Sequence, residues 1–90
     1  MYYPFSRDYI KMALKELRGK KKKCPIEWET LKLSSDINGR EGTLQEAVYT
    51  FQTKDGKQYE LDVEGYCGRG YCHRKIFRPC AITAIKEKAS

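Results

Sequence analysis

A short run near the C-terminus combines aromatic, sulfur-containing and basic side chains. Residues 66–78 read Tyr-Cys-Gly-Arg-Gly-Tyr-Cys-His-Arg-Lys-Ile-Phe-Arg. Guanidinium and ammonium groups neutralise phosphates, and Tyr and Phe rings stack on nucleobases. Thiols and an imidazole are also soft metal ligands. The run therefore predicts either a nucleic-acid interface or a metal site.

Four basic residues of this run are the candidate phosphate contacts, and one tyrosine is the candidate exposed stacking residue. They are Arg69, Arg74, Lys75 and Arg78, with Tyr71 for stacking. Neighbouring residues on a strand point to opposite faces, so Arg74 and Lys75 serve one surface only if a rim brings them together. The alternative is that aromatic rings of the run belong to the core and the charged groups are simply solvated.

A metal site would use Cys67, Cys72, His73 and Cys80. Structural zinc sites place cysteine pairs two to four residues apart, and the gap between Cys67 and Cys72 fits only the loose end of that range. Cys72 and His73 are adjacent, so on a strand they point apart. A free cysteine also behaves as a small buried hydrophobe. We predict no bound metal and no cofactor, and zinc binding by these four residues stays open.

Catalysis by a cysteine nucleophile would need a thiol to reach His73, the single histidine of the chain, in a cleft that holds a substrate. The sequence has no glycine-rich phosphate loop. We therefore predict that the protein is not an enzyme.

The net charge of +6 is unevenly distributed along the 90 residues. Eight Lys/Arg against two Asp/Glu give residues 1–23 a net charge of +6, four against nine give residues 24–65 a charge of −5, and six against one give residues 66–90 a charge of +5. If the basic ends meet in the fold, they form one face that attracts polyanions. The predicted partner is single-stranded nucleic acid or an oligonucleotide.

An acidic strand face supports a different function. Its carboxylates are Glu46, Glu60, Asp62 and Glu64. Such a face imitates phosphates, so the alternative is a small adaptor or inhibitor that docks on a partner protein.

Length and composition predict one domain, residues 1–90, inside the cell. No apolar run approaches the roughly 20 residues of a membrane span, and the N-terminus has no signal-peptide pattern. We predict a cytoplasmic protein without membrane contact, in which the four cysteines do not form a disulfide framework.

The first predicted element is a helix over residues 6–18. Ser6 is a suitable N-cap and Gly19 a suitable C-cap. The apolar stripe of this helix is Ile10, Ala13, Leu14 and Leu17. A basic linker, residues 19–23, follows it.

The sequence pattern of residues 24–87 predicts β-strands. The apolar positions change parity between Trp28 and Leu31, which indicates a bulge. The alternating runs that contain Phe51 and Tyr59 predict a hairpin that pairs these two residues around Lys54-Asp55-Gly56, with Gly56 in the left-handed region.

A second hairpin is predicted to turn at residues 67–70. Its second strand is expected at residues 72–78 and is broken by Pro79, and a last strand is expected at residues 80–86. One helix followed by five short strands predicts an α+β fold, with the helix packed on a small five-stranded antiparallel barrel.

Two motifs support this architecture. Gly65-Tyr66-Cys67 matches a Gly-aromatic-Cys step, and residues 75–82 (Lys-Ile-Phe-Arg-Pro-Cys-Ala-Ile) match a basic-x-Phe-Arg-x-x-Arg-Ile run except at Ala81. In these motifs, over about residues 58–86, the chain resembles the WYL domain, an Sm/SH3-like module of bacterial transcription regulators. The resemblance implies a ligand-sensing or nucleic-acid-binding regulatory module, to which Lys75 and Arg78 carry over by position. The Trp-Tyr-Leu signature of that family is absent, and Ala81 stands where the family usually has its second Arg.

Overall fold

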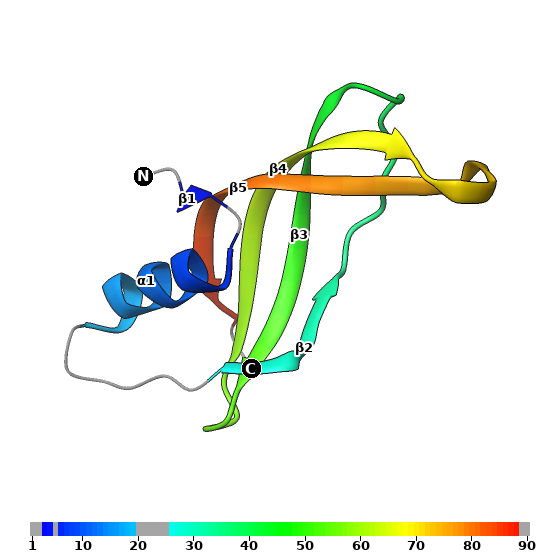
Figure 1. Cartoon of the computed structure of the whole chain (residues 1–90). Helices are drawn as coiled ribbons and strands as arrows, with labels where there is room; N and C mark the ends of the chain where they lie inside the picture. The colour runs from blue at the N-terminus through cyan, green and yellow to red at the C-terminus, as the bar shows by residue number, and fades with distance from the viewer. Residues whose placement is uncertain (1–2, 5, 20–25, 89–90) are drawn as a thin grey trace.

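One helix and an antiparallel sheet make up the fold, in a computed structural model that describes residues 3–4, 6–19 and 26–88. The elements in chain order are β1 (Tyr3–Pro4), α1 (Arg7–Arg18), β2 (Ile26–Leu33), β3 (Leu44–Thr53), β4 (Gln58–Arg69), the 3₁₀ helix η1 (Tyr71–His73) and β5 (Lys75–Glu87). The four long strands pair with their neighbours in sequence, and the two-residue β1 pairs with the other side of β5 (Figure 1). The predicted α+β class is confirmed.

The predicted closure into a five-stranded barrel is not confirmed. The sheet order is β1-β5-β4-β3-β2, and its two edge strands do not pair with each other within the described residues, so the sheet is open. The two strands expected at residues 72–78 and 80–86 are one continuous strand, β5. Pro79 does not break β5 because it lies beside a bulge, where the ladder of hydrogen bonds is already interrupted.

Bulges bend β5, and in each bulge a side chain replaces the interrupted ladder bond. Thr83 and Cys80 are the extra residues, since the register shifts by one between Asp62 and Val63 and again between Glu64 and Gly65. Thr83 Oγ1 donates to the carbonyl of Asp62 at 3.1 Å, and Cys80 Sγ donates to the carbonyl of Glu64 at 3.2 Å. Bulges increase the local bend of a strand. The β4–β5 hairpin consequently changes direction at this point (Figure 1).

The predicted bulge between Trp28 and Leu31 is confirmed, because the register of β2 against β3 shifts between Glu27 and Lys32. Thr30 Oγ1 donates to the carbonyl of Glu27 at 2.6 Å and accepts from the backbone N–H of Gln52 at 2.8 Å. The hydroxyl thereby joins the two strands where the ladder is interrupted.

Helix α1 begins and ends as its sequence predicts. Ser6 Oγ accepts from the backbone N–H of Tyr9 at 3.2 Å, and Gly19 has a φ of +87°. Of the predicted apolar stripe, Ile10, Ala13 and Leu14 are buried, whereas Leu17 is 46% exposed. Leu17 is the last member of the stripe, in the final turn of the helix.

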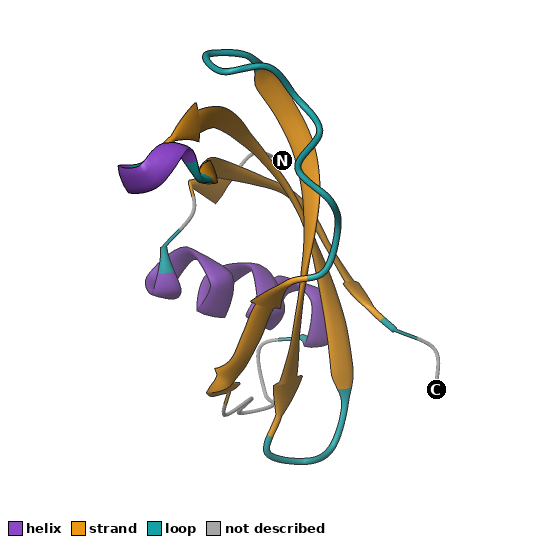
Figure 2. Cartoon of the chain, turned by 90° about the vertical axis from the view of Figure 1, so that its right-hand side faces the viewer, coloured by secondary structure: helices purple, strands orange, loops and turns teal. Residues whose placement is uncertain are grey.

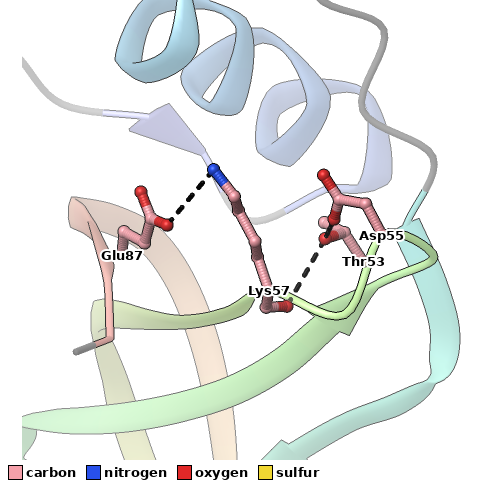
Figure 3. Close-up of polar contacts among 4 residues, drawn as sticks. All are labelled: Thr53, Asp55, Lys57 and Glu87. Carbon is pink, nitrogen blue, oxygen red and sulfur yellow. Dashed lines mark hydrogen bonds and ion pairs between the residues drawn. The ribbon is translucent and has the colours of Figure 1, made fainter. Parts of the chain in front are cut away.

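The β3–β4 hairpin has the predicted register, with Phe51 opposite Tyr59. The N–H of Thr53 donates to the carbonyl of Lys57 at 2.9 Å, and Gly56, at a φ of +86°, donates to the carbonyl of Thr53 at 3.0 Å. The Thr53 hydroxyl also bonds the carboxylate of Asp55. Lys57 Nζ lies 3.5 Å from a carboxylate oxygen of Glu87, which ties the turn to the end of β5 (Figure 3).

The two faces of the sheet differ sharply. The inner face carries the core, formed by Tyr59, Leu61 and Val63 of β4 with buried residues of α1, β2, β3 and β5. The outer face of β4 carries Glu60, Asp62 and Glu64, which are half-buried. Because side chains alternate along β4, its odd-numbered residues continue to face the core side up to Arg69.

Candidate nucleic-acid interface

The β4–β5 hairpin extends beyond the core as a two-stranded arm, defined here as residues 66–78. Its cross-strand pairs are Tyr66–Arg78, Cys67–Phe77, Gly68–Ile76 and Arg69–Lys75. In Figure 1 the arm extends to the right while α1 lies to the left, and in Figure 2 the short helix η1 lies at the end of the arm. The molecule measures 44 Å along its longest axis and 24 Å along the next.

The turn of the arm lies further along the chain than predicted. Residues 67–69 belong to β4, and the turn is closed by the N–H of Gly70, which donates to the carbonyl of Arg74 at 2.9 Å. Cys72 provides the left-handed conformation, with a φ of +61°. Gly68 belongs to β4, and neither Gly68 nor Gly70 has a positive φ. At Gly70 a Cβ would lie 3.1 Å from Cγ2 of Ile76 on the opposite strand.

The end of the arm brings together four of the five predicted site residues. Tyr71 in η1 is 98% exposed, and Arg69, Arg74 and Lys75 are exposed on either side of it. Arg69 and Lys75 are directly opposite each other across the two strands. The predicted conflict between Arg74 and Lys75 does not arise, because Arg74 belongs to the turn and only Lys75 to the strand. We call these four residues the arm tip.

Arg78, the fifth predicted residue, lies apart from the arm tip. It is opposite Tyr66 on the outer face, whereas Arg69 and Lys75 are on the inner face. Tyr66 is 51% exposed and is itself opposite Leu44, which is 53% exposed. Two basic-aromatic groups therefore occupy opposite faces of the arm.

The described basic residues of the chain ends do not meet. Helix α1, with the exposed Lys11 and Lys15, lies at the left in Figure 1, whereas the arm extends to the right. The lysine run of residues 20–23 is outside the described residues. The single basic face considered from the sequence is therefore not formed by the described part of α1 and the arm.

The loop of residues 34–43 packs against the base of the arm, and one glutamine organises it. Gln45 Oε1 accepts from the N–H groups of Asn38 at 3.2 Å and Gly39 at 2.7 Å, and from Cys67 Sγ at 3.1 Å. Gln45 Nε2 donates to the carbonyl of Asp36 at 3.0 Å. The sequence analysis did not identify Gln45, because a glutamine in an alternating strand gives no local sign that it binds a distant loop.

Backbone bonds fix the other end of the same loop. The N–H of Gly42 donates to the carbonyl of Cys67 at 2.7 Å, and the N–H of Cys67 donates to the carbonyl of Thr43 at 2.9 Å. Gly39 approaches Cys67 so closely that a Cβ there would lie 2.6 Å from the thiol sulfur. The loop is therefore held in one position relative to the arm.

A small pocket lies between this loop and the arm, with a volume of about 200 Å³. Its lining is polar: Asn38, Gly39, Arg40, Glu41, Gly68, Arg69 and Lys75. We call it the tip pocket. Arg40 thereby joins the predicted residues Arg69 and Lys75, and Glu41 Oε2 lies 3.9 Å from Arg69 Nε. Arg40 was not predicted, because all of β3 and most of β4 separate it from Arg69 in the chain.

The cysteines of the arm region have separate surroundings. Cys67 is buried against Gln45, Cys72 is exposed in η1, and Cys80 is exposed at a bulge of β5. Among the described residues, no group of three or more His, Cys, Asp or Glu side chains is arranged to hold a metal ion.

Burial raises the pKa of the Tyr49 hydroxyl above its usual 10.0. The ring of Tyr49 lies on the inner face of β3, with its centroid 6.4 Å from that of Phe77. Both rings are half-buried against the core, so Phe77 belongs to the packing of the arm base and not to its binding surface.

The outer face gathers the acidic residues as predicted. Glu46 is directly opposite Glu64, and Glu60 and Asp62 follow on the same face. Lys86 partly neutralises them, since its Nζ lies 3.2 Å from Asp62 Oδ2. An open groove of about 860 Å³ lies beside this face, and its charged lining residues are Glu29, Lys32, Glu60 and Lys88.

No helix in the described ranges is long and apolar enough to cross a membrane. Searches for known proteins that resemble the chain found no matching family model, curated protein or solved structure. The resemblance to the WYL domain therefore stays a prediction.

Proposed function

We propose that this protein is a non-enzymatic, cytoplasmic regulatory module that binds single-stranded nucleic acid through its arm. One observation carries the proposal: the fully exposed ring of Tyr71 lies among three exposed cations, Arg69, Arg74 and Lys75, at the end of a projecting hairpin. An aromatic ring beside cations is the usual means of binding a single strand, because the ring stacks on a base while the cations contact phosphates.

The shape of the arm favours nucleic acid over a compact ligand. A projecting two-stranded ribbon can present side chains at its end to a long polymer. Tyr71 has almost no burial of its own to explain its aromatic character, since its ring adds nothing to the core. An exposed ring next to cations is suited to stacking on a base.

The proposal includes a structural relationship between this domain and the small Sm/SH3-like barrels. Its support is the bending of β2 and β5 by bulges and the WYL-like sequence motifs of the arm. The family position of the second Arg is Ala81 here, and Ala81 is only 1% exposed. We therefore assign binding to the arm tip and not to that position.

Replacing Arg69, Arg74 and Lys75 together with glutamine will weaken the binding of a labelled single-stranded oligonucleotide by about two orders of magnitude at low salt. With these cations removed, the slope of log affinity against log salt will become markedly less negative. Fluorescence anisotropy with DNA, RNA and duplex probes across salt concentrations measures both quantities.

The matched control replaces Lys11, Lys15 and Lys54 with glutamine. These lysines are exposed and lie outside the arm, so their replacement removes the same amount of charge elsewhere on the surface. This control is expected to keep most of the salt slope. Tyr71→Ala should weaken binding by about tenfold, and Tyr71→Phe should keep it, because stacking needs only the ring. Equal losses in the arm variant and the lysine control would contradict the proposed site.

Docking on a partner protein is the second candidate function, and the acidic outer face with its adjoining groove favours it. Replacing Asp62 with Asn and Glu64 with Gln should abolish capture of a basic partner protein and leave oligonucleotide binding within about twofold. The arm-tip variant should behave in the opposite way. A partner retained by both variants would exclude both surfaces as its binding site.

A further inference from the structure

The tip pocket has the charge and size of a site for a single phosphate group. Its three cations come from two segments that are far apart in sequence: Arg40 from the loop, and Arg69 and Lys75 from the arm. Against them stands one carboxylate, Glu41, so the lining has a net charge of +2. A volume of about 200 Å³ is too small for a nucleotide but accommodates a phosphate with its water shell.

The two arm cations are an unfavourable pair without an anion. Arg69 and Lys75 are directly opposite each other in the ladder, and like charges in that position repel. Glu41 relieves this repulsion only weakly, because its oxygen is 3.9 Å from Arg69 Nε and both side chains are more than half exposed. A bound anion would neutralise both cations together.

The loop that supplies Arg40 is already in place before any ligand binds. Gln45 holds the N–H groups of Asn38 and Gly39, and Thr43 Oγ1 donates to the carbonyl of Arg40 itself at 2.5 Å. Binding therefore orders little backbone, which keeps its entropic cost low.

We propose that the tip pocket binds one phosphate group, with Arg40, Arg69 and Lys75 as its ligands and Glu41 as the group it displaces. The inference rests on the proposed function, since the strand backbone supplies this phosphate next to the base stacked on Tyr71. A small phosphorylated molecule offers the same chemistry, and the experiment distinguishes the two sources.

Inorganic phosphate is the first probe, titrated into the full chain and followed by the amide chemical shifts of Gly39 and Gly68, with sodium chloride of equal ionic strength as reference. We expect a saturable shift with a dissociation constant on the order of millimolar. Arg40→Ala should weaken it about fivefold to tenfold, and Glu41→Gln should tighten it about threefold.

Lys54→Ala is the matched control, because it removes one exposed cation from the β3–β4 turn and should leave the phosphate titration unchanged. The increase in phosphate affinity expected for Glu41→Gln cannot come from misfolding, because damage to the fold does not raise affinity. The absence of a phosphate-specific shift, or equal effects of Arg40→Ala and Lys54→Ala, would overturn the inference.

Oligonucleotide binding by the same variants separates this inference from the proposed function. If the strand supplies the phosphate, Arg40→Ala will weaken oligonucleotide binding by about fivefold to tenfold, as it weakens phosphate binding. Oligonucleotide binding that does not depend on Arg40 would reject the strand as the source of the phosphate but leave the arm as the interface. Phosphate binding that depends on Arg40, without any oligonucleotide binding, would support the pocket, reject the proposed function and identify a small phosphorylated ligand as the source.

Discussion

Replacing Gly65 with alanine will lower the free energy of unfolding by about 3 kcal/mol, because the added methyl group has no room between β4 and β5. A Cβ at this position would lie 2.5 Å from the backbone carbonyl oxygen of Arg78 and 2.5 Å from Cζ of Phe77. The Phe77 ring can rotate, but the Arg78 carbonyl belongs to the ladder. The methyl group therefore forces β5 away from β4 at the base of the arm. Urea denaturation at neutral pH measures the loss.

Gly68→Ala is the matched control for this prediction. It adds the same methyl group to the same strand, three residues closer to the arm tip, where the nearest atom is Ile76 Cγ1 at an ordinary 3.5 Å. We expect its effect to stay within about 0.5 kcal/mol. Equal losses in the two variants would mean that the close approach at Gly65 does not exist in solution.

Replacing Phe51 with alanine will lower the free energy of unfolding by about 4 kcal/mol, close to the whole stability of a domain of this size. Phe51 is 2% exposed, and its ring stacks on that of Tyr59 with centroids 5.4 Å apart and an interplanar angle of 16°. The substitution removes this stack and leaves a cavity in the inner face. A thermal melt followed by circular dichroism should show a variant that is largely unfolded at 37 °C.

Leu44→Ala on the same strand provides the comparison, since Leu44 is 53% exposed on the outer face. Its loss should stay below about 0.5 kcal/mol. A Phe51→Ala variant as stable as Leu44→Ala would show that β3 does not present Phe51 to the core, and the register of the β3–β4 hairpin would then be wrong.

Local signals in the sequence were sufficient for α1 and for the β3–β4 hairpin. Ser6 and Gly19 define the ends of the helix by their own conformations, and Gly56 defines the turn in the same way. The alternation on both sides of that turn permits only one register that keeps Phe51 and Tyr59 on the same face. In each case the residues that determine the structure lie within a few positions of one another.

The position of the arm's turn was predicted wrongly because its glycines do not take the turn conformation. Gly68 belongs to β4, and the small size of Gly70 accommodates Ile76 on the opposite strand. Cys72, which has no sequence preference for a positive φ, takes the turn position instead. A glycine that is needed for packing across the sheet cannot be distinguished in the sequence from a glycine that is needed for a turn.

The candidate site was predictable in its residue types but not in its grouping. Tyr71, Arg69 and Lys75 were identified from the sequence and lie together, whereas Arg78 lies on the other face. Arg40 enters only because Gln45 and Cys67 hold a distant loop against the arm. Hydrogen bonds between polar side chains and a remote backbone leave no periodic pattern in the sequence.

The position of β5 in the sheet determines the order in which the chain can fold. β1 pairs with β5, and Tyr3 is opposite Ile82, so the start of the chain has no strand partner until β5 has formed. Contacts between such distant residues form slowly, because the chain entropy is lost before the contact is gained. We expect the β3–β4 hairpin to form early and α1 to dock last. During synthesis, the edge of β4 stays open until the ribosome has released β5.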